Sequence, residues 1–152
     1  MNADRFLVDT NVLVYAYDRS ESAKQVRARQ VLGRLRDQDA GVLSTQVLAE
    51  FFSAVTRKLR DRMTPREGHR HLQEYARSWK VVGLTSDIVL EAARGVVEYQ
   101  FPFYDAQIWA TAKEIRIPRV LSEDFAHGTR IEGVQFLNPF VSALPGEEPS
   151  PC

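Results

Sequence analysis

Apolar residues along this chain follow two patterns: short continuous runs, and longer stretches in which they recur every three or four positions. Short continuous runs are typical of buried strands, and the longer spacing is typical of helices. The runs predict five strands, at Phe6–Val8, Gly41–Leu43, Lys80–Leu84, Arg119–Leu121 and Val134–Leu137. The spaced stretches predict five helices, over residues 22–36, 45–59, 64–79, 86–99 and 104–115.

The boundary of the helix over 64–79 is the best marked in the chain. Thr64 and Glu67 have the spacing of a capping box, in which each side chain bonds the backbone N–H of the other residue. Pro65 stands at the first helical position, where its missing N–H leaves no hydrogen bond unmade. We therefore expect this helix to begin at Pro65.

Alternation of short buried strands with helices predicts an α/β fold with a central, mainly parallel sheet, because parallel neighbours need crossover helices on the sheet faces. The length of 152 residues and a hydrophobic content of 44% suit a single domain with one core. We place this domain at residues 1–142. The tail "ALPGEEPSPC", residues 143–152, is rich in proline and acid and is expected to be disordered.

Composition narrows the classes of protein that fit. Lys plus Arg and Asp plus Glu are 20 each, so a nucleic-acid partner must be argued from local charge. A single cysteine, Cys152, excludes an intrachain disulfide and a cysteine-based zinc site. No apolar run approaches the ~20 residues that span a bilayer, and the N-terminus lacks the pattern of a signal peptide. We expect a protein of the cytoplasm with no membrane contact.

Four carboxylates occur where the functional edge of such a sheet should lie. Asp9 directly follows the first strand, and Asp124 lies shortly after the strand "RVL". Asp105 stands at the start of a helix, and Glu50 lies on the helix that follows the strand "GVL". In parallel sheets, ligands gather at the carboxyl ends of the strands. Any one of the three aspartates alone is better explained as a helix cap or a turn residue.

Glu50 is harder to explain in this way, because "VLAEFFSAV" surrounds it with apolar residues. An unpaired buried carboxylate is unfavourable by several kcal/mol, whereas a shared divalent cation compensates several carboxylates at once. Mg²⁺ and Mn²⁺ prefer carboxylate oxygens, which fits a site without cysteine or an evident histidine ligand. Without a cation the carboxylates repel one another, so we expect raised pKa values for some of them.

The segments "FLVDTNVLVYAYD", "LSTQVLAEF", "FPFYDAQIWATA" and "VLSEDF" stand in the order, spacing and local sequence of the PIN domain. Over about residues 5–140, the chain most resembles the bacterial toxin members of that family, the VapC-type ribonucleases. The resemblance implies a PIN-like three-layer fold and a metal-dependent endoribonuclease that uses Mg²⁺ or Mn²⁺. It also implies that the chain is the toxin of a type II toxin–antitoxin pair.

Site residues carry over by position in those segments. The resemblance implies that the acidic metal-binding and catalytic positions are Asp9, Glu50, Asp105 and Asp124. It further implies that Asn11 and Ser122 are their polar supports. Glu123 is an alternative ligand because it neighbours Asp124, and the family pattern favours Asp124.

Local charge partly answers the objection that the whole chain is neutral. Residues 57–80 hold eight basic and three acidic residues, a net charge of +5. The candidate RNA contacts in this run are Arg57, Lys58, Arg60 and Arg62. A solvated helical face with its connecting loop explains the run equally well. Aromatic residues beside Asp105, such as Tyr104 and Trp109, are explained as core, although their clustering leaves base stacking open.

The resemblance implies three partners: an RNA substrate, a protein antitoxin whose C-terminal segment lies across the acidic groove, and a second copy of the chain in a homodimer. The alternative function is a non-catalytic RNA-binding or interaction module with the same fold, and the complete acidic set argues against it. An aspartyl phosphatase is excluded because Asn11 stands where its second aspartate is expected. No glycine-rich dinucleotide or P-loop motif follows the first strand.

Overall fold

The computed structural model describes residues 4–148, and within this range the strands form one six-stranded sheet in the order β3-β2-β1-β4-β6-β5. The strands are β1 (Phe6–Val8), β2 (Gly41–Ser44), β3 (Lys80–Val82), β4 (Arg119–Leu121), β5 (Arg130–Ile131) and β6 (Val134–Leu137). The helices are α1 (Thr10–Tyr15), α2 (Ser22–Asp37), α3 (Thr45–Arg57), α4 (Pro65–Ser78), α5 (Ser86–Tyr99) and α6 (Phe103–Glu114). All neighbouring strands are parallel except β5 and β6.

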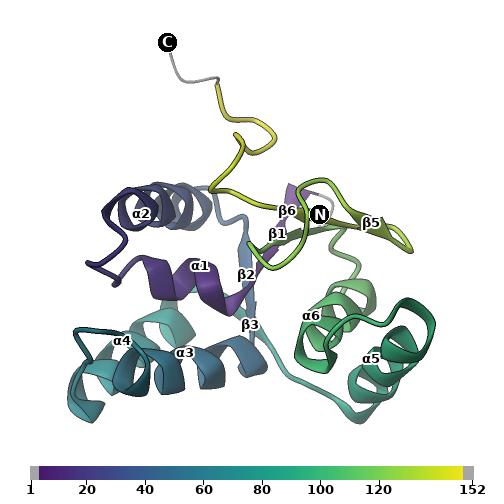
Figure 1. Cartoon of the computed structure of the whole chain (residues 1–152), viewed down its shortest axis with the longest axis horizontal. Coiled ribbons are helices and arrows are strands. Elements are labelled where there is room, and N and C mark those ends of the chain that lie inside the picture. The colour runs from purple at the N-terminus through teal and green to yellow at the C-terminus, as the bar shows by residue number, and fades with distance from the viewer. Residues whose placement is uncertain (1–3, 149–152) are drawn as a thin grey trace.

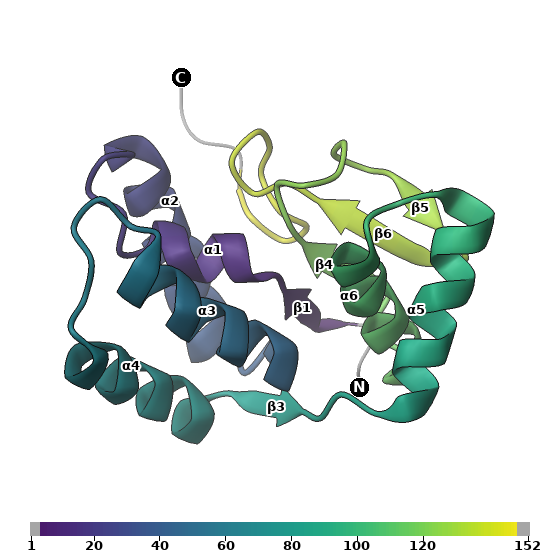
Figure 2. The ribbon, with the colours of Figure 1, turned by 60° about the horizontal axis from the view of Figure 1, so that its bottom comes forward.

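Helices cover both faces of the sheet. Helices α1 to α4 lie on one side of it and α5 and α6 on the other, as Figures 1 and 2 show from two directions. The predicted α/β, three-layer arrangement with a mainly parallel sheet is therefore confirmed. Among residues 4–148, no helix has both the length and the apolar character needed to cross a membrane.

The chain changes direction across the sheet at β1. From β1 it runs outward through β2 to β3, and it then returns to the other side of β1 with β4. Residues Leu7 and Val8 are paired with Val120 and Leu121, so the two strands end side by side. Such a reversal opens a crevice at the carboxyl ends of the strands, because the flanking connections diverge to opposite faces. The residues that follow β1 and β4 therefore meet at this crevice.

All ten predicted strands and helices form, with bounds within two residues of those expected. The capping box at Thr64 is present, with both of its hydrogen bonds. Strand β3 ends at Val82 instead of residue 84, because the Leu84 N–H leaves the ladder and donates to Thr45 Oγ1. Helix α1 and strand β5 were not predicted. With six and two residues, they are too short to show a period.

The C-terminal segment corrects one prediction. Residues 143–148 were expected to be disordered, yet Leu144 is buried in the core. Glu147 forms ion pairs with Arg27 and Arg34 of α2. These contacts hold the chain against the domain past residue 142. The local sequence of the tail does not reveal them, because the two arginines lie more than 100 positions earlier in the chain. Residues 149–152 of the predicted tail lie outside the described residues.

Close packing of α5 on α6 fixes the helix that carries Asp105. Trp109 of α6 is fully buried, and Gly95 of α5 faces its ring. A Cβ atom added at Gly95 would lie 2.6 Å from the Trp109 ring, closer than a van der Waals contact allows. The glycine is therefore required for the approach of the two helices.

We expect Gly95→Ala to lower the free energy of unfolding by about 1–3 kcal/mol, because the added methyl group must displace a packed indole ring. Gly33→Ala in α2 is the matched control. Nothing lies within 4 Å of a Cβ there, so alanine should stabilise the helix by about 0.5–1 kcal/mol. Urea denaturation of both variants tests this. Equal effects of the two substitutions would contradict the packing argument.

Candidate metal centre

Asp9 is held at the junction of β1 and α1. It caps α1, with its Oδ1 accepting from the Thr10 N–H at 2.7 Å. Its Oδ2 accepts from the Ser122 hydroxyl, also at 2.7 Å, and only 5% of the residue is exposed. Asp9 is thus a helix cap, the commoner explanation of such an aspartate, and at the same time a buried carboxylate at the crevice.

Ser122 joins the ends of β1 and β4. Its hydroxyl is fully buried, donates to Asp9, and accepts from the Asp124 N–H at 3.1 Å and from Asn11 Nδ2 at 3.4 Å. The Asn11 Oδ1 in turn accepts from the Glu123 N–H at 3.4 Å. Ser122 therefore bonds both Asp9 and the loop after β4, and Asn11 bonds Ser122 and the same loop; their role as polar supports of a metal site stays a prediction.

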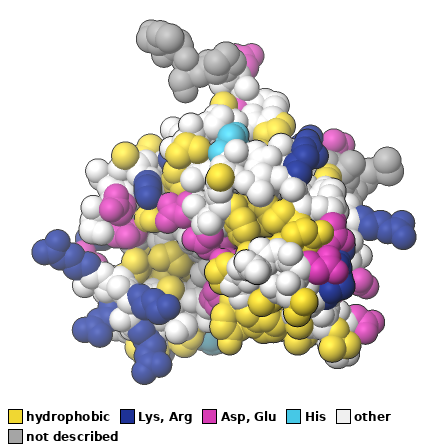
Figure 3. All heavy atoms as spheres, turned by 45° about the vertical axis from the view of Figure 1, so that its right-hand side comes forward, with side chains coloured by type: hydrophobic (Ala, Val, Ile, Leu, Met, Phe, Trp, Pro, Cys, Tyr) yellow, Lys and Arg dark blue, Asp and Glu magenta, His cyan; other side chains and the backbone are white. Residues whose placement is uncertain are grey.

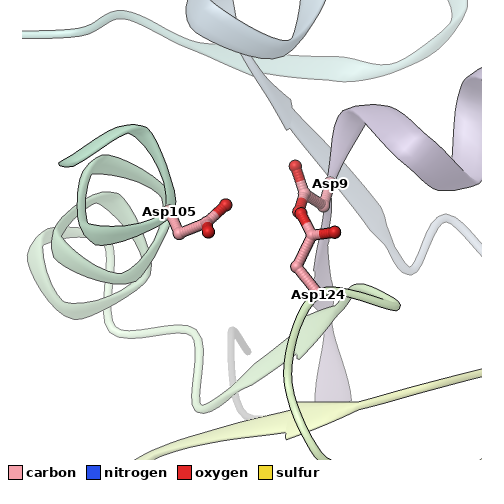
Figure 4. Close-up of side chains that lie close together, drawn as sticks. All are labelled: Asp9, Asp105 and Asp124. Atoms are coloured by element: carbon pink, nitrogen blue, oxygen red, sulfur yellow. The ribbon is translucent and has the colours of Figure 1, made fainter. Parts of the chain in front are cut away.

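Three aspartates bring their oxygens together. Asp9, Asp105 and Asp124 each place a carboxylate oxygen within 4.8 Å of the others. Figure 4 shows Asp105 pointing from α6 toward Asp9 and Asp124, which come from the ends of β1 and β4. Asp9 is buried, Asp105 half-buried and Asp124 exposed, so the group opens to solvent on one side.

Glu50 lies in the same cavity but outside this three-carboxylate group. The cavity has a volume of about 370 Å³ and is lined by Asp9, Glu50, Asp105 and Asp124, among others. Glu50 Oε1 accepts from Gln46 Nε2 at 2.6 Å, and Oε2 accepts from Thr10 Oγ1 at 3.4 Å. Glu50 therefore has two uncharged hydrogen-bond partners, and its expected role as a metal ligand stays a prediction.

Gln46 is a residue that the sequence reasoning missed. Its Nε2 donates to Glu50 and also to the Tyr104 carbonyl at 3.1 Å, so it links α3 to the start of α6. Its Oε1 is buried and has no hydrogen-bond partner among the described residues. The spacing of four between Gln46 and Glu50 on one helix was the available signal.

Glu123 also lines the cavity, and its carboxylate has two partners outside the acidic group. The Tyr15 hydroxyl donates to Glu123 Oε1 at 2.5 Å, and Lys24 Nζ donates to Oε2 at 3.0 Å. The Lys24 ammonium also lies 4.7 Å from the centre of the Tyr15 ring. Because its charge is already paired, Glu123 is a weaker candidate ligand than Asp124.

Burial raises the pKa of Asp9 to about 7, against the opposing effect of the Ser122 hydrogen bond. Burial also raises the pKa of Asp105 to about 6, and the charge of Asp124 adds to it. Raised pKa values were expected from repulsion between the carboxylates, but burial is the larger cause for both residues. A divalent cation would offset both effects, so this set of oxygen donors fits Mg²⁺ or Mn²⁺.

The candidate RNA contacts are placed unevenly. Lys58 lines the cavity of the acidic group, whereas Arg60 and Arg62 line neighbouring hollows and Arg57 is exposed at the end of α3. Tyr104 also lines the cavity and is 66% exposed. Trp109, by contrast, is core, as predicted.

The structure thus shows an α/β fold with carboxylates grouped at the reversal point of a mainly parallel sheet, where they could hold a metal ion. The model of the PIN domain family matches residues 6–127, and the chain belongs to this family. A search of curated proteins found no match.

Solved structures share this fold at low sequence identity. A toxin–antitoxin complex from Klebsiella pneumoniae aligns with a TM-score of 0.63 and 18% identity, over 88% of this chain and 96% of the other. VapBC2 from Rickettsia felis, bound to a promoter DNA fragment, aligns with a TM-score of 0.62 and 15% identity, over 86% of this chain and 96% of the other. VapC20 of Mycobacterium tuberculosis, a Sarcin-Ricin loop cleaving toxin, aligns with a TM-score of 0.58 and 18% identity, over 76% of this chain and 86% of the other.

The raised pKa of Asp9 predicts how stability depends on pH when a chelator is present. The folded protein retains a proton on Asp9 up to about pH 7, whereas the unfolded chain loses it near 3.8. Folding therefore binds a proton between these values, and the free energy of unfolding should fall as the pH rises from 5 to 8. Asp105 acts in the same sense.

Asp9→Asn should remove most of this pH dependence, and at pH 8 it should stabilise the chelated protein by on the order of 2–4 kcal/mol. Asp61→Asn, at an exposed position, is the control and should follow the wild type. Urea denaturation in chelator at pH 5 and pH 8 measures the difference. Equal pH dependence in wild type and Asp9→Asn would show that Asp9 ionises freely.

Proposed function

We propose that the chain is a metal-dependent endoribonuclease, the toxin of a type II toxin–antitoxin pair, which hydrolyses phosphodiester bonds of RNA in the cytoplasm. The observation that carries this proposal is the convergence of three carboxylate oxygens within 4.8 Å of one another, in a PIN domain. Keeping Asp9 buried is unfavourable when its charge is uncompensated, so a role with a cation explains the arrangement. The alternative, a non-catalytic module, gives these carboxylates no such role.

In this proposal the three aspartates share one task and Glu50 has another. Asp9, Asp105 and Asp124 would hold the cation, and Ser122 and Asn11 fix the loop that carries Asp124. When bound, Mg²⁺ or Mn²⁺ supplies Lewis acidity toward water and toward the phosphate oxygens. Glu50 faces the same cavity from α3 and is oriented by Gln46, so it acts as a further ligand or as an acceptor for a proton from water.

We propose that RNA contacts residues at the rim of the cavity. Lys58 offers a cation to a phosphate, and the exposed ring of Tyr104 offers a face on which a base can stack. The proposed RNA contacts of the α3–α4 region are Arg57, Lys58, Arg60 and Arg62.

The proposed antitoxin restrains the enzyme by covering the acidic cavity. Structures with this fold include toxin–antitoxin complexes from Klebsiella pneumoniae and Rickettsia felis, which supports a protein partner of this kind. A segment carrying arginine suits the cavity, because the guanidinium group pairs with a carboxylate through two hydrogen bonds and so competes with a cation. The expected homodimer stays a prediction.

Cleavage of RNA should depend on a divalent cation and on Asp124 but not on its neighbour. The wild type should cleave total bacterial RNA with Mn²⁺ and lose the activity in excess chelator. Asp124→Asn should lower turnover by at least about 100-fold, as expected for loss of a metal-binding group. Glu123→Gln makes the same chemical change one residue away, at a carboxylate paired with Tyr15 and Lys24, and should retain most of the turnover.

Gel analysis of the cleavage products, with circular dichroism to confirm folding, makes this comparison. Full activity in excess chelator would overturn the metal dependence. A loss in Glu123→Gln with activity kept in Asp124→Asn would exchange the roles of the two residues.

Expression tests the toxin assignment separately from the nuclease assignment. Expressed alone, the wild-type chain should stop bacterial growth, and Asp9→Asn should not. Co-expressed with the product of the neighbouring gene, the wild type should be harmless and should purify as a complex. If the wild type is harmless alone at a level where Asp9→Asn is equally soluble, the toxin role is wrong and the nuclease proposal stands without it.

A further inference from the structure

Two further hollows adjoin the cavity of the acidic group, and we call the row of three the groove. The first, of about 230 Å³, shares Asp18 and Leu59 with the cavity. The second, of about 300 Å³, shares Tyr17, Arg19 and Asp61 with the first. Because successive hollows share lining residues, the three lie next to one another in a row, from the three aspartates to the space between the α1–α2 connection and α4.

The far end of this groove is basic. We call the second hollow the arginine hollow, because four arginines line it: Arg19, Arg29, Arg62 and Arg70. Two carboxylates also line it, Asp61 and Glu67, and Glu67 is engaged in the capping box of α4. Positive charge therefore exceeds negative charge in this hollow, the reverse of the acidic cavity.

Several exposed cations of residues 4–148 form no ion pair, Arg66 and Arg77 among them, and the arginines of the groove belong to this set. On the opposite side of the sheet, Arg94 and Lys113 both form ion pairs with Glu91 and Glu132. By contrast, within residues 4–148 no ion pair is formed by the arginines Arg19, Arg60, Arg62 and Arg70.

Solvated arginines are common on protein surfaces, so exposure alone would mean little. Here the unpaired arginines converge on one hollow, and that hollow joins the candidate active site. Figure 3 shows acidic side chains bordering a hollow of the surface and Lys and Arg side chains gathered beside it. The combination indicates a partner with repeated negative charge.

We propose that the groove binds the backbone of single-stranded RNA, with phosphates of the strand lying on Arg19, Arg62 and Arg70 in the arginine hollow. The inference rests on the proposed nuclease function, since it treats the acidic end as the place of cleavage. A single strand fits because the exposed ring of Tyr104 at that end can stack only on an unpaired base. Contacts of arginine with phosphates position a strand without reading its sequence.

This arrangement solves an electrostatic difficulty of the acidic cavity. A group of carboxylates repels phosphate, so the cavity by itself contributes little attraction for RNA. A basic subsite away from the reacting bond supplies that attraction. Because it binds substrate and transition state alike, it should affect KM and leave kcat nearly unchanged.

The test compares two triple variants that remove the same charge. The first variant removes three of the four arginines of the hollow, as Arg19→Ala/Arg62→Ala/Arg70→Ala. Arg29 is kept because its Nε donates to the Ala16 carbonyl. The control changes three other exposed cations that do not line this hollow, as Arg66→Ala/Arg77→Ala/Lys80→Ala. Circular dichroism confirms that both variants fold.

Fluorescence anisotropy with a labelled single-stranded RNA of about 12 nucleotides, a length in the range of single-strand sites, measures binding in chelator. For the hollow variant we expect Kd to rise about tenfold or more. The slope of log K against log salt should fall by about 2, since each phosphate contact to a single strand contributes ~0.7. The control should change Kd by less than about threefold. With Mn²⁺, the hollow variant should show a raised KM and an unchanged kcat.

The outcomes separate this inference from the function on which it rests. If the wild type cleaves RNA while both variants match it in Kd, KM and salt dependence, the inference is wrong and the nuclease stands. Equal weakening by the two variants would also overturn it, because general charge would then explain binding. If RNA binding is unchanged and only the complex with the neighbouring gene product is lost, the hollow binds a protein instead. If no RNA is cleaved but the hollow variant alone binds weakly, the inference holds and the nuclease proposal fails.

Discussion

The structure depends on one buried carboxylate, Asp9, at the point where β1 becomes α1. Its two hydrogen bonds, from the Thr10 N–H and the Ser122 hydroxyl, hold the end of β1 against the end of β4. The same Ser122 oxygen accepts from the Asp124 N–H, so the loop after β4 is fixed by the group that holds Asp9. Burial nevertheless raises the pKa of Asp9 to about 7. The local geometry is therefore well satisfied in hydrogen bonds but unfavourable for the ionised form, a combination that a bound cation relieves.

The net charge of zero hides an uneven distribution of acidic and basic residues over the molecule. The chain is neutral overall, yet some of its charged residues form ion pairs and others do not. Arg94 and Lys113 neutralise Glu91 and Glu132 beside α5, and Glu147 meets two arginines of α2. The described residues without an ion pair include the aspartate group at one end of the groove and Arg19, Arg62 and Arg70 of the arginine hollow at the other. Because paired charges cancel at short range, the unpaired ones dominate the field that a ligand meets.

The sequence foretold the parts of the fold that local physics decides. Strands such as β1 and β4 are almost wholly buried, so they read as unbroken apolar runs, and Thr64 with Glu67 marked the start of α4 without tertiary help. The rule that ligands gather at the carboxyl ends of parallel strands then indicated where the aspartates lie. Contacts between distant segments were beyond reach: the pairing of Glu123 with Lys24, 99 positions apart, and the burial of Leu144. The basic run 57–80 was visible, but Arg19 joins the arginine hollow from outside it.

Gln46 links the two sides of the acidic cavity, which come from different helices. Glu50 comes from α3 on one face of the sheet and Asp105 from α6 on the other, and Gln46 Nε2 bonds both Glu50 and the carbonyl of Tyr104, next to Asp105. Its Oε1 is buried without a partner among the described residues, which is unfavourable by about 1–3 kcal/mol. A leucine would fill the same space without this penalty, whereas only a side chain with two donors bridges the two acceptors. Gln46 therefore serves the geometry between the two sides at the expense of stability, a pattern that functional sites show more often than cores do.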